Sequence, residues 1–348
     1  MFFRWIDIGK IPFLKFIRCK LTFFLKVVLA VLIVLIFGIG IYFYVSRIYH
    51  AKGPLQNNVI FLIRNGMSLK ETTKKLFNSR IISNPYIFRY LTQMRFGSQS
   101  IKAGEYELEI GSSMLQVAEK IMYGKYFMYS ISFPEGFTVK QIFKRLRENP
   151  FLIGELPAEL PREGTLYPST YKFSLGTHRS EIIEQAILEQ KKIVDDIWEI
   201  RDVNNLIKSK EDLVILASIV EKETSRSDER PHVASVFINR LSSSIRLQAD
   251  STVIYGAFEG DYELAERKLK RSDFCKKTPY NSYLVNGLPP TAISNPSRLS
   301  LEAVAKPLQT DDLYFVSDGR GGHFFSKNFK DHGVNVQKWR KISSKSKS

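Results

Sequence analysis

The stretch Leu213–Leu241, LVILASIVEKETSRSDERPHVASVFINRL, decides how the second half of this chain folds. Val214 and Glu221 recur at helical spacing among leucines, valines and alanines, so the pattern predicts a helix with Glu221 on its apolar face. The same count turns the two following side chains, Lys222 and Glu223, toward solvent. An acid on the buried side of a helix is unusual, because apolar surroundings destabilise its charged form.

Residues typical of helix ends indicate where the helices of this region begin and end. Ser209 stands three residues before Asp212, which is the spacing of a cap that begins the helix. The segment Ser225–Pro231 then interrupts the pattern, and we expect Ser227 to cap a second helix whose first turn tolerates Pro231. The two helices therefore meet at a corner that carries the acid.

Two hypotheses account for Glu221. A carboxyl group kept neutral by apolar neighbours is what a general acid requires near neutral pH. A buried glutamate paired with an arginine, such as Arg240, for purely structural reasons fits the same pattern. The spacing alone leaves both hypotheses open.

The composition is that of a globular chain with an excess of positive charge. Its 348 residues are 44% hydrophobic, which is enough for two or three domains with a sizeable core. Lysine and arginine outnumber aspartate and glutamate by 51 to 35, which gives a net charge of +16. Such a surplus favours an anionic partner, which is a nucleic acid, a membrane surface or an acidic polymer depending on the compartment.

An uncharged apolar run, Val27–Val45, lies near the N-terminus. Its length is close to the roughly 20 residues that a membrane-spanning helix needs. More lysines and arginines precede the run than follow it closely, so the N-terminus is predicted to be cytoplasmic and the remainder to lie outside. A cleaved signal peptide is the rival interpretation, but the bulky residues of YFYVSRIYH do not resemble a cleavage site. We therefore predict an uncleaved anchor and no nucleic-acid partner.

The two cysteines, Cys19 and Cys275, fall on opposite sides of the predicted membrane, so they are not expected to form an intrachain disulfide. Neither belongs to a spacing that is typical of a metal site. We expect the protein to use no metal and no cofactor.

A repeated unit follows the anchor. Three segments, Gly66–Leu76, Gly111–Ile121 and Gly136–Leu146, align without gaps, and a strand-like run precedes each of them. Each has a turn glycine, then a serine or threonine, and a Glu or Gln three residues further on, which is the pattern of a capping box. The three predicted capping pairs are Ser68 with Glu71, Ser113 with Gln116, and Thr138 with Gln141.

The first two repeats enclose another predicted helix, which Asn84 and Pro85 begin. The order strand, helix, helix, strand over residues 57–127 resembles the LysM-like modules that bind glycan chains in cell-wall proteins. A small α+β platform that only holds the next domain away from the membrane would show the same order.

Loops rich in hydrogen-bonding side chains follow the second helix of the opening stretch, and such loops often carry sites. Gln248, Asp250 and Thr252 alternate as on a strand, so we expect their side chains to share one face and bind a polar group of the ligand. A polar strand face without a ligand fits the pattern equally well. The further binding candidates are Tyr280 and Tyr283 for stacking on sugars, Asn281 for hydrogen bonding, and His323.

With these segments in order, the chain resembles the YceG-like endolytic murein transglycosylases of the bacterial cell envelope. The matching segments are EGTLYPSTY, ASIVEKET, ERPHVASVFINRL, LQADSTVIYG, TPYNSYLVNGLPPTAISNP and YFVSDGRGGHFFS. The resemblance runs from about Asn57 to Trp339 and implies cleavage of the β-1,4 bond between N-acetylmuramic acid and N-acetylglucosamine within peptidoglycan strands, with Glu221 as the catalytic acid. The chain departs from the family pattern at Ser169, where aspartate is usual, and at Ser251, where proline is usual.

A single acid suffices for this chemistry. An ordinary glycosidase needs two carboxyl groups, one to protonate the leaving oxygen and one to activate water or attack the sugar. In a lytic transglycosylase, we expect Glu221 to protonate the glycosidic oxygen and then to take the proton of the muramyl C6 hydroxyl, which closes a 1,6-anhydro ring. Asp250 and Asp273 leave a lysozyme-type hydrolase open. A non-catalytic membrane tether to the wall is the alternative from another class.

The predicted fold class is α+β, with an N-terminal transmembrane helix, a LysM-like α+β module and an α+β catalytic domain. The predicted boundaries are a cytoplasmic tail (1–26), the transmembrane helix (27–45), a linker (46–56), the LysM-like module (57–127), a connecting region of the catalytic domain (128–205), the transglycosylase core (206–340) and a disordered tail (341–348). The resemblance implies a place in the bacterial inner membrane with the catalytic domain outside the cytoplasm. Its implied partner is the peptidoglycan strand, with peptidoglycan synthases or division proteins as further candidates, and its implied role is the termination of strand elongation.

Overall fold

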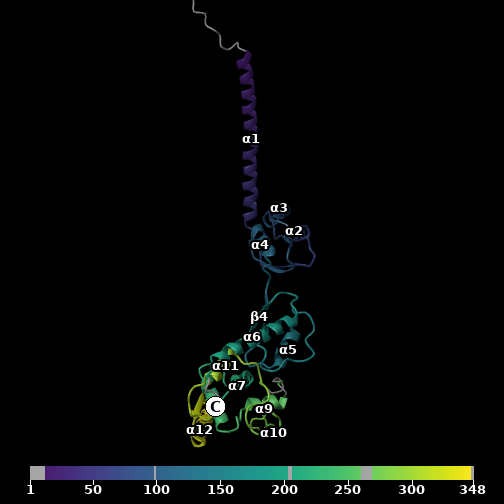
Figure 1. Cartoon of the computed structure of the whole chain (residues 1–348). Helices are drawn as coiled ribbons and strands as arrows, with labels where there is room; N and C mark the ends of the chain where they lie inside the picture. The colour runs from purple at the N-terminus through teal and green to yellow at the C-terminus, as the bar shows by residue number, and fades with distance from the viewer. Residues whose placement is uncertain (1–11, 98, 203–205, 259, 261–268, 346–348) are drawn as a thin grey trace, which may run out of the picture. The chain divides into compact units, whose positions relative to one another are not determined.

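The computed structural model describes residues 12–97, 99–202, 206–258, 260 and 269–345. These residues form a mixed α/β protein in which helices predominate and the strands pair in three antiparallel two-stranded sheets. The chain divides into two compact units, residues 1–127 and 128–348 (Figure 1). Among the described residues, one core cluster lies in the first unit and two lie in the second.

The first unit begins with a long helix, α1 (Pro12–His50) (Figure 1). Its segment Phe23–His50 contains an 18-residue window with a mean hydropathy of 2.9, and the segment is long and apolar enough to cross a membrane. The uncharged run predicted from the sequence lies inside this segment. The helix continues beyond the predicted end of the span, and Tyr49 in its last turn is buried in the core of the unit.

The rest of the first unit is a small α/β fold. Strand β1 (Val59–Ile63) pairs antiparallel with β2 (Gly104–Leu108), so that Val59 lies opposite Leu108. The helices are α2 (Leu69–Asn78), α3 (Pro85–Phe96) and α4 (Met114–Met122). The strand, helix, helix, strand order predicted from the sequence is therefore present, and Asn84 caps α3 as expected.

The three predicted capping boxes are all confirmed. Helices α2, α4 and α5 (Val139–Glu148) each begin with a serine or threonine whose side chain accepts a hydrogen bond from a backbone N–H, while the Glu or Gln side chain accepts one in return. The glycine that precedes each cap has a positive φ, +80° at Gly66, +71° at Gly111 and +72° at Gly136, a conformation that favours glycine. The repeated sequence thus encodes one local structure three times.

The second unit begins with its own small sheet. Strand β3 (Tyr129–Ser132) pairs antiparallel with β4 (Thr170–Phe173). Helix α5 and the long helix α6 (Arg179–Glu199) bury apolar side chains against this sheet in a common core. Tyr171 is part of that core, and its hydroxyl donates to the backbone oxygen of Tyr167 at 2.7 Å.

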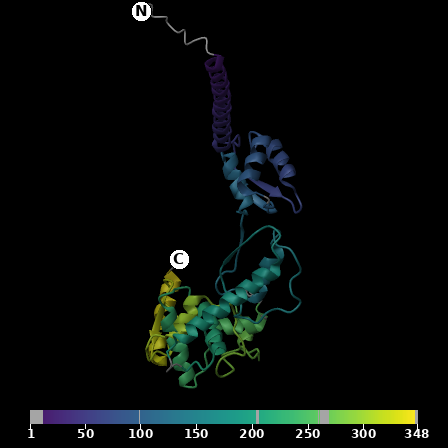
Figure 2. The ribbon, with the colours of Figure 1, turned by 45° about the horizontal axis from the view of Figure 1, so that its top comes forward.

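A group of helices forms the remainder of the second unit. They are α7 (Lys210–Glu223), α8 (Arg230–Ser242), α9 (Asp250–Phe258), α10 (Arg271–Phe274) and α11 (Arg298–Ala305). A hairpin of β5 (Tyr314–Ser317) and β6 (His323–Ser326) and the final helix α12 (Phe329–Lys345) complete the unit, yellow in Figure 2. Residues 341–345, which the sequence analysis placed in a disordered tail, belong to helix α12. Residues 346–348 of that predicted tail lie outside the described residues.

The opening stretch of the sequence corresponds to α7 and α8. Ser209 caps α7 and accepts a hydrogen bond from the backbone N–H of Asp212, as predicted. The predicted cap of α8 is wrong, because Glu229 and not Ser227 occupies that position. Pro231 lies within the first turn of α8, where its missing N–H has no helical partner to lose.

Candidate active site

Helix α7 carries two glutamates at its C-terminal end, and the fold gives them different surroundings. The helix is packed against α6, α8, α9 and α11, so it has neighbours on several sides. Its buried residues extend over most of its length. A helix with so little free surface buries side chains that lie outside a single apolar stripe.

Glu221 is fully engaged in the interior of the protein. Its Oε1 lies 2.8 Å from Nη2 of Arg230, and the Glu221 side chain is only 3% exposed. Its Oε2 accepts hydrogen bonds from the backbone N–H and the hydroxyl of Ser297, at 2.8 and 2.6 Å. Ser297 is also the cap of α11, so the carboxylate lies at a helix N-terminus. The Glu221 carboxylate thus accepts from one cationic and two neutral donors.

The arginine that pairs with Glu221 differs from the one suggested by the sequence. Arg240 instead donates to the backbone oxygens of Arg246, Leu247 and Leu313, at 3.0, 2.9 and 2.6 Å. The pairing hypothesis is therefore correct in kind, with Arg230 as the partner. Arg230 stands in the first turn of α8, nine residues along the chain from Glu221.

Glu223 does not face solvent as the helical count predicted. It is partly buried, and its Oε1 accepts a hydrogen bond from the hydroxyl of Ser251 at 2.7 Å. Burial raises the pKa of Glu223, and the negative charge of Asp250 raises it further, against the opposing effects of Ser251 and His323. Lys222 is also partly buried, with its Nζ 3.3 Å from the backbone oxygen of Gly136.

The segment predicted as a polar strand is largely helical. Helix α9 begins at Asp250, and Gln248 just before it has a φ of +53°. Successive helical residues turn by about 100°, so Asp250 and Thr252 point in different directions and do not share a face. Thr252 is fully buried and bonds the backbone oxygen of Ala249, whereas Asp250 is exposed.

Three of the predicted binding residues lie near Glu223. The Tyr283 hydroxyl donates to Oδ1 of Asp250 at 2.6 Å, and burial and the charges of Asp250 and Glu223 raise the pKa of Tyr283. His323, on β6, is close enough to Glu223 to lower the pKa of that acid, and its Nδ1 lies 2.7 Å from Oε2 of Glu229. Residues from α7, α9, the loop before α11 and the last hairpin therefore converge around one protonatable acid.

Other predicted binding residues use their polar atoms within the fold. Asn281 is 1% exposed and donates from Nδ2 to the backbone oxygens of Phe274 and Lys276, each at 2.9 Å. The Tyr280 hydroxyl bonds Thr291 at 2.8 Å. The contacts made by the remaining two candidates are the bond of Gln248 to Arg240 at 3.2 Å and the bond of Thr252 to Ser282 at 2.7 Å.

Asp273, the other candidate for a second carboxylate, has a local structural role. It accepts a hydrogen bond from the backbone N–H of Lys270 at 2.9 Å and pairs with Lys276 at 3.0 Å. The backbone hydrogen bond and the lysine lower the pKa of Asp273. Its contacts therefore suit a helix cap better than proton transfer.

The sequence analysis did not single out Glu163, a second acid with a raised pKa. Both of its carboxyl oxygens lie within hydrogen-bonding distance of the backbone N–H of Val139, at 3.1 and 3.0 Å, at the start of α5. Burial raises the pKa of Glu163 to about 7. It lines a cavity of about 360 Å³ between α6 and α7, together with Val214 and Thr291. Its only sequence signal is its place at the start of the motif EGTLYPSTY.

The sequence and the fold of this chain have counterparts among known proteins. Residues 61–338 match the model of the YceG-like family, and the chain belongs to that family. Within the residues that the structure describes, no three His, Cys, Asp or Glu side chains are grouped so as to hold a metal ion.

Several individual relatives carry a more specific name. The chain is 28% identical to the endolytic murein transglycosylase of Bacillus subtilis (strain 168), over 81% of this chain and 84% of the relative. It is 25% identical to the endolytic murein transglycosylase of Streptococcus pneumoniae (strain D39), over 79% of this chain but only 57% of that longer relative. A crystal structure of a YceG-like protein from Listeria monocytogenes superposes with a TM-score of 0.50 at 28% identity, covering 80% of this chain and 99% of the other.

Proposed function

We propose that this chain is an endolytic murein transglycosylase and that Glu223 is its general acid. The family match and the named relatives support the reaction class. The observation that supports the acid is the partly buried carboxyl group of Glu223, whose pKa burial raises. A general acid must hold its proton at working pH, and a raised pKa provides that condition.

The sequence-based hypothesis gave this role to Glu221, and the contacts favour its neighbour. Three donors, Nη2 of Arg230 and the backbone N–H and hydroxyl of Ser297, occupy most of the roughly four acceptor positions of the Glu221 carboxylate. The donors to Glu223 come from one residue, Ser251, through its hydroxyl and its backbone N–H, and neither is a cation. In this proposal Glu221 is a positioning residue that fixes the junction of α7, α8 and α11.

The proposed reaction consumes no water. Neutral Glu223 gives its proton to the glycosidic oxygen between N-acetylmuramic acid and N-acetylglucosamine as that bond breaks toward an oxocarbenium-like state. The resulting carboxylate takes the proton of the muramyl C6 hydroxyl, whose oxygen attacks C1 and closes a 1,6-anhydro ring. The proton count balances, since Glu223 ends the cycle protonated.

A lysozyme-type hydrolase is the second candidate, because Asp250 places another carboxylate in the field of Glu223. An ordinary glycosidase requires such a pair. In the transglycosylase, Asp250 instead accepts the Tyr283 hydroxyl and contributes negative charge that keeps Glu223 protonated. The two candidates predict different products, because hydrolysis leaves a reducing muramic acid end that is heavier by one water.

The test is digestion of isolated peptidoglycan sacculi by the full chain in detergent, with mass spectrometry of the released fragments. We expect 1,6-anhydro ends from the unaltered protein, and a loss of at least about a hundredfold in Glu223→Gln, the order that general acid catalysis contributes. The matched control is Glu221→Gln, at a glutamate two residues before Glu223. We expect this variant to keep measurable activity when it is assayed below its own melting temperature. The reverse result, an inactive but folded Glu221→Gln and an active Glu223→Gln, would restore the sequence-based assignment.

Two further outcomes of the same digestion separate the rivals. Reducing ends from the unaltered protein would identify a hydrolase. An intact sacculus with no released fragments, together with retained binding, would identify a wall tether.

The proposed setting is the bacterial cytoplasmic membrane, with α1 as an uncleaved anchor and the second unit on the extracytoplasmic side. The length and hydropathy of Phe23–His50 support a membrane span, and a signal sequence is the rival. The order of charges around the span supports a cytoplasmic N-terminus. Protease protection of intact spheroplasts distinguishes an exposed second unit from a cytoplasmic one.

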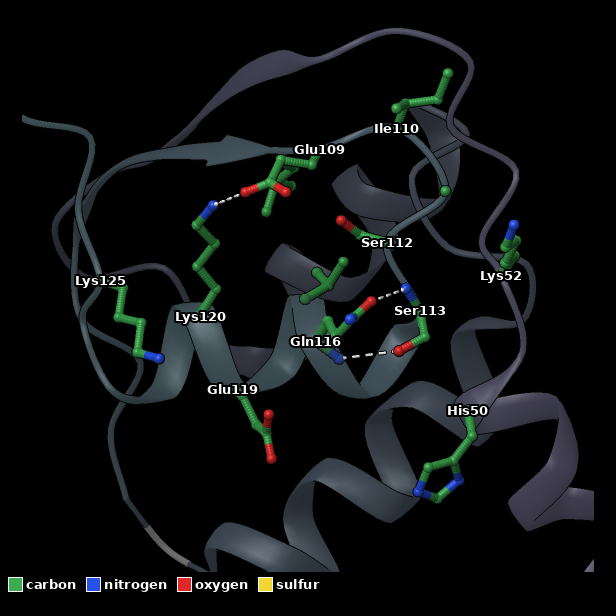
Figure 3. A pocket seen from close by; sticks show the side chains of 13 residues that line it. His50, Lys52, Glu109, Ile110, Ser112, Ser113, Gln116, Glu119, Lys120 and Lys125 are labelled. Atoms are coloured by element: carbon green, nitrogen blue, oxygen red, sulfur yellow. Dashed lines mark hydrogen bonds and ion pairs between the residues drawn. The ribbon is translucent and has the colours of Figure 1, made fainter.

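We also propose that the LysM-like part, residues 57–127, binds glycan. A pocket of about 630 Å³ in the first unit supports this, and Figure 3 shows its polar lining around the capping pair Ser113 and Gln116. Lys120 and Glu109, which form an ion pair at 3.2 Å, also line it. Loss of sacculus binding in Gln116→Ala, with the fold intact, is the expected result. Peptidoglycan synthases or division proteins remain predicted partners.

A further inference from the structure

Helix α3 carries large apolar side chains on its solvent-exposed side as well as on the side that faces the core. Its inner side packs into the core of the first unit through Phe88 and Phe96. Its outer side carries Tyr86, Tyr90 and Met94, which are 84%, 67% and 61% exposed. These three residues are spaced four apart, so they form one line along the helix. A line of large exposed apolar side chains on a folded unit indicates a surface with a partner.

Two residues of this stripe, Tyr90 and Met94, lie beside the apolar helix α1. A groove of about 460 Å³ lies between the two helices. Its lining from α1 includes Gly38, Ile41, Tyr42 and Val45, and its lining from α3 includes Tyr90 and Met94.

The position of α3 beside α1 is fixed by contacts within the unit. Tyr49 in the last turn of α1 is 3% exposed, and its hydroxyl lies 3.3 Å from Oγ1 of Thr92 on α3. Just after the helix, the backbone N–H of Gly53 donates to the backbone oxygen of Gly111 at 3.2 Å. The C-terminal end of α1 is therefore packed into the unit, and these contacts fix the position of α3 along the axis of α1.

That level coincides with the end of the apolar run. The run ends at Val45, and at 1.5 Å per residue the stretch from Gly38 to Val45 spans about 10 Å of the helix. If α1 crosses the bilayer, this stretch lies in the outermost part of the hydrocarbon layer of the bilayer. Side chains of α3 that face the same groove then lie at the boundary of acyl chains and headgroups. Interfacial helices bury their apolar faces to about 5–10 Å at this boundary, and tyrosine is enriched there.

We propose that α3 is an interfacial helix, and that Tyr86, Tyr90 and Met94 insert into the extracytoplasmic leaflet of the bilayer that α1 crosses. Lipid acyl chains fill the groove between the two helices. The exposed Arg89, three residues after Tyr86, faces the phosphates of the headgroups. The inference rests on the proposed anchoring role of α1 and is independent of the glycan chemistry. Its consequence is that the first unit is held against the membrane surface in one orientation.

The test is a measurement of membrane depth on the full chain in vesicles of phosphatidylethanolamine and phosphatidylglycerol. The native cysteines are replaced, Cys19→Ser and Cys275→Ser, and a nitroxide is attached at a single new cysteine. Collisions with oxygen, which concentrates in lipid, are compared with collisions with a water-soluble nickel chelate. The reporter positions are Tyr90→Cys on the stripe, Ile36→Cys in the middle of the apolar run, and Ile60→Cys on β1.

Ile60 is the matched control, because it is an apolar residue of the same unit that is 51% exposed. We expect a ratio of oxygen to nickel collisions severalfold higher at Tyr90→Cys than at Ile60→Cys, and highest at Ile36→Cys. Met94→Cys should repeat the result for Tyr90→Cys, and unchanged circular dichroism confirms that the labelled chains are folded.

Each contrary outcome has a separate meaning. A stripe as accessible to nickel as Ile60, with Ile36 protected, would overturn the inference and leave the anchor intact. A stripe shielded from both reagents would also overturn it, because a protein surface such as a second copy of the chain would then cover α3. Exposure of Ile36 to nickel would refute the anchor itself.

Discussion

The pair of Glu221 and Arg230 gives the sharpest stability prediction for this protein. Arg230 has a side-chain exposure of 5%, and Glu221 neutralises it at 2.8 Å. Glu221→Gln removes the negative charge but keeps an oxygen that accepts from Ser297. The nearest other acid is Glu135, at 3.4 Å from Arg230 and 54% exposed, which offers only partial compensation.

The magnitude follows from the burial of the pair. Removing one partner of a buried ion pair costs about 3–5 kcal/mol, and the nearby Glu135 places the expected loss at the lower end, about 3 kcal/mol. For a unit of this size, each kcal/mol shifts the melting temperature by roughly 2–4 °C, so we expect a fall of about 6–12 °C. The intrinsic fluorescence of Trp198 and Trp339, both in the second unit, follows the melting of the full chain in detergent.

The matched control is Glu302→Gln, which also removes a glutamate from an arginine. Glu302 lies 2.7 Å from Arg298, but both side chains are substantially exposed, at 38% and 46%. Exposed pairs contribute less than about 1 kcal/mol, so this control should melt within a few degrees of the unaltered protein. A Glu221→Gln protein that melts together with the Glu302→Gln control would refute the structural role of Glu221.

A double substitution tests the physical cause. Glu221→Leu with Arg230→Met replaces the ion pair by apolar side chains of similar volume. Such replacements are often neutral or stabilising when both charges are removed together. We expect the double variant to recover most of the stability that Glu221→Gln loses. Continued instability would show that the hydrogen bonds of Ser297, and not the unpaired charge of Arg230, cause the loss.

The remaining predictions concern two other buried polar groups. The folded protein raises the pKa of Glu163 from 4.5 to about 7, so between these pH values it binds more protons than the unfolded chain. Glu163 should therefore make stability fall as pH rises across this window, by on the order of 3 kcal/mol, and the fall in urea titrations of Glu163→Gln should be smaller by about that amount. Asn295 is fully buried, accepts from the backbone N–H of Leu166 and donates to the oxygen of Phe137, each at 2.9 Å. Asn295→Ala leaves the N–H of Leu166 unpaired, whereas the oxygen of Phe137 keeps the backbone N–H of residue 295 as a donor. The substitution should therefore cost about 1–3 kcal/mol in urea titrations, the cost of one unpaired buried group, and no measurable loss would contradict the reasoning.

Local structure was predictable where the deciding contacts are close in the sequence. The capping boxes at Ser68, Ser113 and Thr138 join residues three apart, so the repeat in the sequence specifies them without help from the rest of the fold. The same is true of Asn84 and Pro85, which begin α3.

The candidate acid could be identified only from the tertiary structure. Glu221 and Glu223 differ by two residues on one helix, and a helical count predicts one buried and one exposed side chain. The count fails because α7 is packed against helices from several parts of the chain, so that Ser251 from α9 meets Glu223. The segment from Gln248 to Thr252 was likewise misread as a strand, because alternation over so few residues does not distinguish a strand from a helical turn.

The sequence by itself determined the apolar helix near the N-terminus, the repeated strand, turn and helix unit, and the family to which the chain belongs. Only the tertiary structure decided that Arg230, and not Arg240, neutralises Glu221, and that Glu223 is left with a raised pKa. The physical reason is distance along the chain. Caps and apolar stripes depend on neighbours within a few residues, whereas the protonation of an acid depends on every group that the fold brings near it.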